Sequence, residues 1–204
     1  ARHGGFLGGG RRQRQMCIIG SFYASNGLSM PYRIFVPQGY DAKKSYPLVL
    51  FLHGRGERGT DNTADMYQNI GMFSGEHSLV SPNGQARFPS IVLVPQCSDN
   101  SADQEWARWV GNSPETPFSG LGKDGSYVQH REPSMSGAAA LELLDYTLQT
   151  YAIDRQRIYI TGISMGGFGT WEFITRWPEL FAAAIPMAGY SDPTKADLIT
   201  HIPT

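Results

Sequence analysis

The segment Gly162-Ile163-Ser164-Met165-Gly166 places a serine between two glycines, each two residues away from it. It follows the apolar run 157–161 and precedes a helical pattern over 165–176, so we predict a sharp strand-to-helix turn at the serine. The glycines remove side chains that would collide in such a turn. The N–H of Met165, first in the helix, would stabilise negative charge developing on a substrate oxygen. This pattern favours Ser164 as a nucleophile that attacks a carbonyl carbon; the alternative is a glycine-rich turn with an incidental serine.

A second candidate segment, HGRGERG, covers residues 53–59 and directly follows the apolar run Tyr46–Leu52. Its small residues allow a backbone N–H to point towards the nucleophile, and we expect the N–H of Arg55 to be the second oxyanion donor. His53 precedes the serine and is set in the loop, so we expect it to pack or to hold the loop. Glu57 and Arg58 either pin the loop as an ion pair or lie in solvent.

Other ligand classes do not fit the sequence. No Lys and Ser/Thr follow Gly167 as in a phosphate-binding Walker loop, and no G-x-G-x-x-G follows an expected strand. A net charge of -1 argues against nucleic acid as the main partner, and no apolar run approaches the roughly 20 residues that cross a bilayer. We expect no metal and no cofactor.

Strands and helices alternate along the chain, which predicts an α/β fold with a mainly parallel sheet. Two runs, 17–24 and 30–36, are expected to form an antiparallel pair that opens the sheet. The continuous apolar run 46–52 is typical of a strand covered on both faces. Further strands are expected at 91–94, 157–161 and, more weakly, 182–187. Helices are expected at 137–151 and at 165–176, the latter ending before Trp177-Pro178.

The region from Ser98 to Ser136 is rich in Gly, Pro, Ser and Asp and reads as a long loop. A long loop after a strand is usually part of a binding site. Trp106 and Trp109 lie in this loop. They either wall an acyl or aryl pocket or anchor the loop by packing.

Four stretches together resemble one protein family: YRIFVPQGYD, YPLVLFLHGRGERGTDN, IVLVPQC and RIYITGISMGGFGTWEFITRWPELFAAAIPMAG. From Leu28 onwards the chain is similar to bacterial carboxylesterases of the α/β-hydrolase superfamily, a group related to polyhydroxybutyrate depolymerases and feruloyl esterases. The resemblance implies an α/β-hydrolase fold and a Ser-Asp-His esterase for small alkyl or aryl esters. The alternatives are a prolyl-oligopeptidase-like serine peptidase and a non-catalytic hydrolase-like binding fold.

The acid and base of such a triad are not evident in the sequence. They should follow Ser164, yet only Asp192, Asp197 and His201 do so with suitable chemistry. We therefore expect them beyond Thr204, with C-terminal strands missing from this chain. A serine without its base loses about 10⁴ to 10⁶ in rate, so we expect the 204 residues alone to be nearly inactive. An incomplete sheet would also expose an edge and favour association.

The remaining features concern the N-terminal segment, the extent of the domain, the cysteines and the cellular compartment. Residues 1–15 combine glycines with Arg2, Arg11, Arg12 and Arg14 and are expected to be a basic linker or an artificial extension. Residues 16–204 form the expected hydrolase domain. Cys17 and Cys97 allow one disulfide or two thiols. The compartment stays open, with a secreted or extracytoplasmic location slightly favoured.

Overall fold

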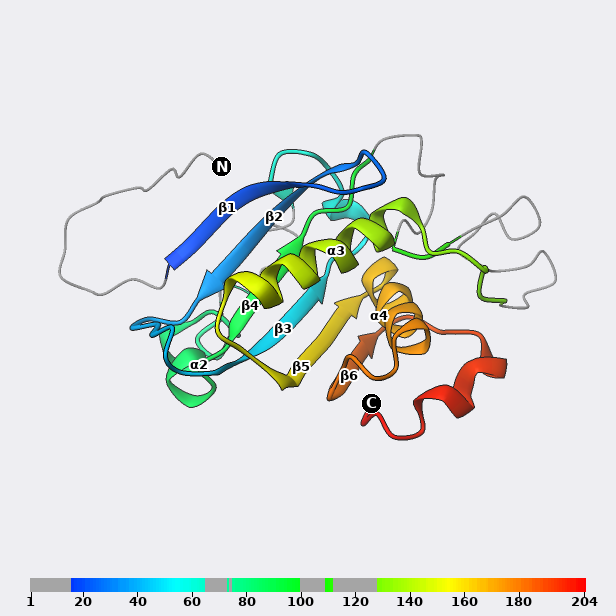
Figure 1. Ribbon diagram of the computed structural model, residues 1–204. Helices are drawn as coiled ribbons and strands as arrows, with labels where there is room; N and C mark the ends of the chain where they lie inside the picture. Colours follow the sequence, from blue (N-terminus) through cyan, green and yellow to red (C-terminus); the bar gives the residue numbers. More distant parts are fainter. Residues whose placement is uncertain (1–15, 65–72, 74, 100–108, 112–127) are drawn as a thin grey trace.

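Six strands form one mixed sheet in the computed structural model, which describes residues 16–64, 73, 75–99, 109–111 and 128–204 (Figure 1). The strands are β1 (Met16–Tyr23), β2 (Ser29–Val36), β3 (Tyr46–Leu52), β4 (Ile91–Pro95), β5 (Ile153–Ile163) and β6 (Ala183–Met187). Their order across the sheet is β1-β2-β4-β3-β5-β6. The pairs β1–β2 and β2–β4 are antiparallel, whereas β4–β3, β3–β5 and β5–β6 are parallel. The expected antiparallel opening pair and mainly parallel sheet are confirmed.

The helices follow the predicted pattern with small differences. Helix α4 (Met165–Arg176) has the predicted bounds, and α3 (Met135–Thr150) begins two residues before the predicted start. The reason is a cap: the Ser134 hydroxyl accepts the N–H of Gly137 at 2.9 Å. Helix α2 (Pro82–Arg87) was not predicted, because its six residues are too short to show a helical apolar period. Two 3₁₀ segments, η1 (Arg55–Glu57) and η3 (Pro193–Ile199), complete the described elements.

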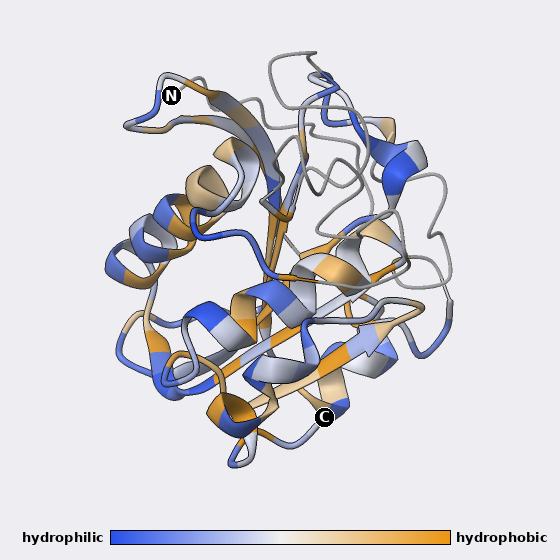
Figure 2. Ribbon diagram, turned by 90° about the vertical axis from the view of Figure 1, so that its right-hand side faces the viewer, coloured by the Kyte–Doolittle hydropathy of each residue, from blue (hydrophilic) through white to orange (hydrophobic). Residues whose placement is uncertain are grey.

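Alternating side chains on the central strand divide the core between the two faces of the sheet. Leu48, Leu50 and Leu52 pack with α3 and α4 in one cluster, and Phe51 packs in a second cluster on the opposite face. Figure 1 shows α3 and α4 lying across the same face of the sheet. In Figure 2 the hydrophobic colour is concentrated on the central strands, with hydrophilic colour on the outer sides of the helices. The helical face is therefore the main core of the protein.

The opposite face is only partly covered. Pro47 and Val49 of β3 are half-buried, so the expectation of a strand buried on both faces is wrong for its first half. Val49 lines an apolar hollow of about 860 Å³ together with residues of β5 and β6 that point to the same side, namely Tyr159, Thr161, Ala183, Ile185 and Met187. Nothing among the described residues fills this hollow. Ile185 is 63% exposed.

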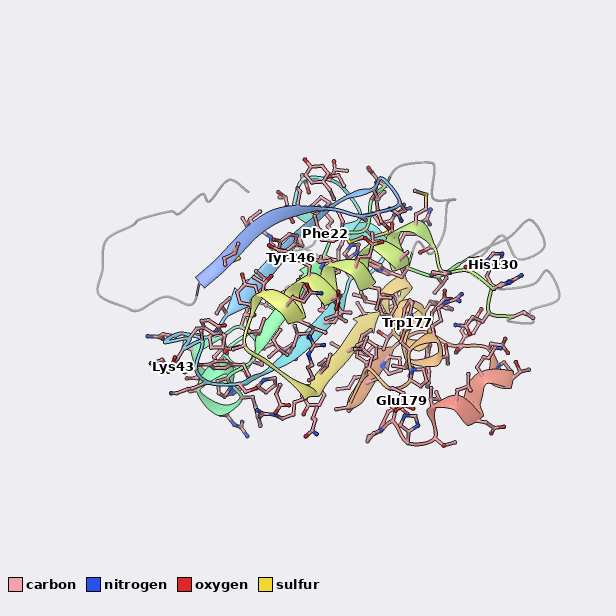
Figure 3. All side chains as sticks on the ribbon, viewed as in Figure 1. Phe22, Lys43, His130, Tyr146, Trp177 and Glu179 are labelled. Atoms are coloured by element: carbon pink, nitrogen blue, oxygen red, sulfur yellow. The ribbon has the colours of Figure 1, made fainter. Side chains whose placement is uncertain are left out.

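The hairpin of β1 and β2 is held against α3. Phe22 lies beside Tyr146, with ring centroids 5.7 Å apart (Figure 3). In the hairpin turn, the backbone N–H of Ser25 donates to the Glu142 carboxylate at 2.8 Å. These contacts fix the antiparallel edge relative to the helical layer. Among the described residues, no helix is both long and apolar enough to cross a membrane.

Replacing Leu50 by Ala should lower the free energy of unfolding by about 3 kcal/mol, because the side chain is fully buried at the centre of the sheet and would leave a cavity. Urea unfolding followed by fluorescence measures this change. Leu198→Ala is the matched control, since Leu198 is 47% exposed and should cost less than about 1 kcal/mol. Equal losses in the two variants would contradict the assigned core.

Candidate active site

The predicted reactive segments meet at the carboxyl ends of the parallel strands. β3 ends at Leu52 and runs into His53-Gly54, while β5 ends at Ile163 and runs into Ser164. Leu52 pairs with Gly162 across the two neighbouring strands, so the two segments are side by side. A Cβ atom on Gly54 would lie 3.9 Å from the Cβ of Ser164. In open α/β sheets this edge is where ligands bind.

Ser164 adopts a strained backbone conformation at the predicted turn. Its φ is 54° and its ψ is −117°, which is rare for a residue with a side chain. Such a conformation costs about 1–3 kcal/mol and persists only where the surroundings impose it. Here the N–H of Ser164 donates to the carbonyl of Met187 at 2.9 Å, and its own carbonyl accepts the N–H of Phe168 at 3.0 Å. The side chain is exposed at the head of α4, as predicted.

The two glycines of the motif have the packing role that their spacing predicts. A Cβ on Gly166 would lie 1.8 Å from the carbonyl oxygen of Leu52, and one on Gly162 would lie 2.4 Å from the carbonyl oxygen of Gly166. Both contacts are with backbone, which cannot move aside. The first turn of α4 therefore packs directly on the end of β3, with Met165 as its first residue. The N–H groups of a first turn have no acceptor within the helix and favour negative charge.

His53 is a structural residue of the loop. It is fully buried, its Nε2 accepts the N–H of Cys97 at 2.9 Å, and its Nδ1–H donates to the carbonyl of Gly54 at 2.7 Å. Burial is the main cause that lowers the pKa of His53 to about 4, and the charge of Arg58 lowers it further. A neutral ring with both nitrogens engaged holds the loop and does not act as a base. The expected loop-holding role agrees with this geometry.

Gln96 is a site residue that the sequence analysis missed. It directly follows β4 and is fully buried. Its Nε2 donates to the backbone carbonyl of Glu57 at 3.2 Å and to the Asp61 carboxylate at 3.1 Å, while its Oε1 accepts the N–H of Asn62 at 2.7 Å. One amide thereby ties three parts of the loop to the neighbouring strand. A polar residue at the end of the apolar run IVLVP was the available signal.

Trp109 lies in the core. It has no exposed surface, its indole N–H donates to the carbonyl of His53 at 3.0 Å, and the two rings meet edge to face at 5.2 Å. The expectation that Trp109 lines a substrate pocket is therefore contradicted, and its alternative as a loop anchor fits these contacts. The physical reason is that the indole is wedged between His53 and Gly169. Trp106 lies outside the described residues.

A buried ion pair on α4 holds two described parts of the long loop. Glu172 is 2% exposed, and its Oε1 accepts the N–H of Gly111 at 3.0 Å and the Nε–H of Arg176 at 2.8 Å. Arg176 also donates to the carbonyl of Arg131 at 2.8 Å and to that of Glu132 at 3.1 Å. Burial raises the pKa of Glu172, although the charge of Arg176 opposes the shift. An acidic residue on the core side of α4 was the sequence signal for this pair.

Among the described contacts, none of the three downstream candidates for acid and base has a hydrogen bond to Ser164. Asp192 caps η3 by accepting the N–H of Thr194 and also accepts the N–H of Gln129, both at 2.9 Å. His201 is exposed, and its Nε2 lies 3.2 Å from the carbonyl of Pro178, just past the end of α4. Trp177 and Glu179 mark this end in Figure 3. Since α4 has 12 residues, its length of about 18 Å separates His201 from Ser164. Asp197 is exposed on η3.

The remaining reactive groups are the two cysteines and the potential metal ligands. Cys17 is exposed and Cys97 buried, and they are not bridged to each other. Within the described part of the chain, no group of three or more His, Cys, Asp or Glu residues could hold a metal ion.

A mainly parallel sheet of this order, with a strained serine between β5 and α4 beside a His-Gly loop, defines the α/β-hydrolase class. Comparison with known families agrees with this class: residues 24–200 match the Esterase family, described as "Putative esterase". The chain belongs to this family.

Individual relatives include an esterase and a depolymerase. The chain is 37% identical to acetylxylan esterase A of Emericella nidulans over 79 residues, which are 37% of this chain and 26% of the relative. It is 26% identical to poly(3-hydroxyalkanoate) depolymerase C of Paucimonas lemoignei over 122 residues, covering 53% of this chain and 30% of that protein. The chain thus spans less than a third of the length of each of these two relatives.

Solved structures give the same result for the fold. The crystal structure of a thermostable esterase is 37% identical, with a TM-score of 0.72 over 91% of this chain and 44% of the other. The feruloyl esterase module from Clostridium thermocellum is 16% identical, with a TM-score of 0.56 over 92% of this chain and 60% of the other, and shows the shared fold alone. The resemblance to carboxylesterases is confirmed.

We predict that the stability of the protein falls in acid because of His53. Between pH 6.5 and pH 4 the unfolded chain binds a proton on this ring that the folded protein does not bind, so the free energy of unfolding decreases as the pH falls. The expected contribution of His53 is about 3 kcal/mol. Urea unfolding at pH 7 and pH 4 measures it by comparing the protein with His53→Gln, in which this part of the pH dependence should disappear. If the free energy of unfolding of the two proteins changes equally with pH, the pKa of His53 is not lowered in the folded protein.

Proposed function

We propose that the protein hydrolyses carboxylic esters through an acyl-enzyme on Ser164. The observation that carries this proposal is the backbone of Ser164, which has a φ of 54° and presents an exposed hydroxyl at the head of α4, beside the loop that follows β3. Membership of the Esterase family supports the reaction class. Strain at one exposed serine is typical of a nucleophile that must reach a substrate.

The proposed reaction has two stages. Oγ of Ser164 attacks the ester carbonyl carbon and loses its proton to a base, and the negative charge on the carbonyl oxygen is stabilised by the N–H groups of Arg55 and Met165. The bond to the alcohol oxygen breaks, and the alcohol leaves with the proton. Water then attacks the acyl carbon, the bond between this carbon and Oγ of Ser164 breaks, and the carboxylic acid leaves as the serine hydroxyl is restored. We place the base and its acid outside the described residues, because none of the described histidines forms a hydrogen bond with Ser164.

The proposed substrates are small alkyl or aryl esters, feruloyl esters among them. Related proteins are named for acetylxylan and poly(3-hydroxyalkanoate), both of which are esters. These relatives do not favour the peptidase alternative. The loop between Ser98 and Ser136 is the proposed source of the acyl or aryl pocket, since two of its described parts are held to α4, the helix that begins beside Ser164.

Ser164→Ala in the natural protein that carries this sequence should abolish p-nitrophenyl butyrate hydrolysis, by about 10⁴-fold or more, because no other group can form the acyl-enzyme. Labelling by a fluorophosphonate probe should disappear in the same variant. Ser191→Ala, a serine on the segment after β6, is the matched control and should retain both. Undiminished turnover in Ser164→Ala would exclude the proposed nucleophile, and faster cleavage of peptide p-nitroanilides than of esters would favour a peptidase.

A second proposal concerns association of two copies through the apolar face at β6. β6 pairs with β5, and the N–H of its Ala184 donates to the carbonyl of Pro203 at 2.9 Å. Its Ile185 is exposed over the apolar hollow, and exposed apolar patches favour contact with another chain.

We expect the 204-residue chain to exceed its monomer mass of 22.5 kDa in light scattering, and Ile185→Asp to shift it to the monomer. The charge would have to be desolvated in the apolar contact, which is unfavourable. Ile19→Asp is the control, because Ile19 is 51% exposed on β1, at the opposite edge of the sheet. A monomer in the unmodified protein, or dissociation by Ile19→Asp alone, would contradict association through β6.

A further inference from the structure

Two aromatic side chains lie close to the candidate nucleophile, at the start of α4. Phe168 belongs to the first turn of this helix, where its N–H donates to the carbonyl of Ser164 at 3.0 Å. The side chain of a helical residue points back towards the N-terminus of its helix, so the Phe168 ring covers the turn that begins at Ser164. This ring meets the ring of Tyr190 edge to face, with centroids 4.6 Å apart. Phe168 and Tyr190 thus form an aromatic pair beside the serine.

Tyr190 reaches this position because the chain after β6 packs on the start of α4. Met187, the last residue of β6, accepts the N–H of Ser164 at 2.9 Å. Two residues later, a Cβ on Gly189 would lie 2.5 Å from the backbone nitrogen of Phe168, so the two backbones are in direct contact. Tyr190 is therefore three residues beyond a strand end that is hydrogen-bonded to the serine.

The backbone between β6 and Tyr190 is strained and held. Ala188 has a φ of 52°, which is rare for a residue with a side chain. Such strain persists where the surroundings impose it, and it clusters at ligand sites. Here the indole N–H of Trp171 donates to the carbonyl of Gly189 at 3.2 Å, which fixes the segment to α4. The backbone of Tyr190 is thus held in place, whereas 41% of the residue's surface is exposed.

The sheet order places the aromatic pair opposite the loop that follows β3. β5 lies between β3 and β6, and the three strands are parallel, so their carboxyl ends lie on the same side. Ser164, at the end of β5, therefore has the β3 loop on one side and the aromatic pair on the other. Ligands of open α/β sheets bind at these strand ends.

An exposed aromatic side chain at such an edge suits one kind of substrate group. Aromatic rings stack on one another or meet edge to face, and these contacts stabilise a ring more than an alkyl chain of similar size. We propose that Phe168 and Tyr190 are specificity-determining residues that bind an aromatic ring of the ester beside Ser164. This inference rests on the proposed function and deepens it.

The two members of the pair differ in what their removal would test. Phe168 is half-buried and packs against the main core, so its truncation would also remove packing. Tyr190 is more exposed, and its truncation therefore separates substrate binding from folding.

Tyr190→Leu in the natural protein that carries this sequence should lower kcat/KM for a ring-bearing ester by about tenfold, mainly through a higher KM, because an aromatic contact with the bound ring is lost. The ring-bearing substrates are methyl 3-phenylpropanoate, with the ring on the acyl side, and benzyl acetate, with the ring on the alcohol side. The substrate that is affected identifies the side of the ester that contacts the pair. For methyl butyrate, which has no ring, kcat/KM should change less than about twofold. Tyr190→Phe keeps the ring and should retain the wild-type values.

Tyr23→Leu is the matched control, because Tyr23 is 81% exposed on β1, at the opposite end of the sheet order from β6. It should leave kcat/KM for all three esters unchanged. Wild-type kcat/KM for both ring-bearing esters in Tyr190→Leu would overturn the inference, as would an equal loss on all three esters or a loss that follows the melting temperature alone. Failure of the proposed function is distinguished by Ser164→Ala, which would then keep full turnover of methyl butyrate.

Discussion

The backbone of α4 approaches the carboxyl end of β3 so closely that no side chain fits between them. Gly166 meets the carbonyl of Leu52, and Gly162 meets the carbonyl of Gly166. This contact forces the chain to turn within one residue, and Ser164 is that residue. Its φ of 54° is the consequence. The exposed hydroxyl, the position of the first N–H groups of α4 and the neighbourhood of the Gly54 loop all depend on the same close approach.

The loop beside Ser164 is held by buried polar contacts. His53, Glu57 and Gln96 are each almost fully buried, and each forms a hydrogen bond with a backbone group in or beside the loop. Buried polar groups of this kind are costly unless they are satisfied, so their contacts are specific and allow few alternative loop conformations. A rigid loop is the condition for preorganised electrostatic stabilisation, because donors that must reorient contribute less to the transition state.

The two ends of α4 have different tasks. At its first residue the helix meets the strand ends and orients Ser164. Two turns later Glu172 binds the backbone of the long loop at Gly111, and at the last residue of the helix Arg176 binds it at residues 130–132. The segment after β6 then runs towards the far end of the helix, where His201 contacts the carbonyl of Pro178. This arrangement explains why histidine downstream in the sequence is not sufficient to complete a triad.

The sequence by itself determined the features that depend on neighbouring residues. Apolar runs predicted β3 and β5, helix formers predicted α3, and glycine spacing predicted the turn at Ser164, because strand, helix and tight turn are encoded within a few residues. It did not reveal α2, which is too short to show a period, nor the role of Trp109, whose burial depends on His53.

Contacts between distant parts of the chain were decided only by the tertiary structure. Gln96 binds Glu57 across 39 positions, and Glu172 binds Gly111 across 61. No local pattern specifies such partners, since a polar residue within an apolar run is equally compatible with a solvent-facing position. The sheet order makes the difference: it places β3 between β4 and β5, so that their three carboxyl ends bring His53, Gln96 and Ser164 to one edge.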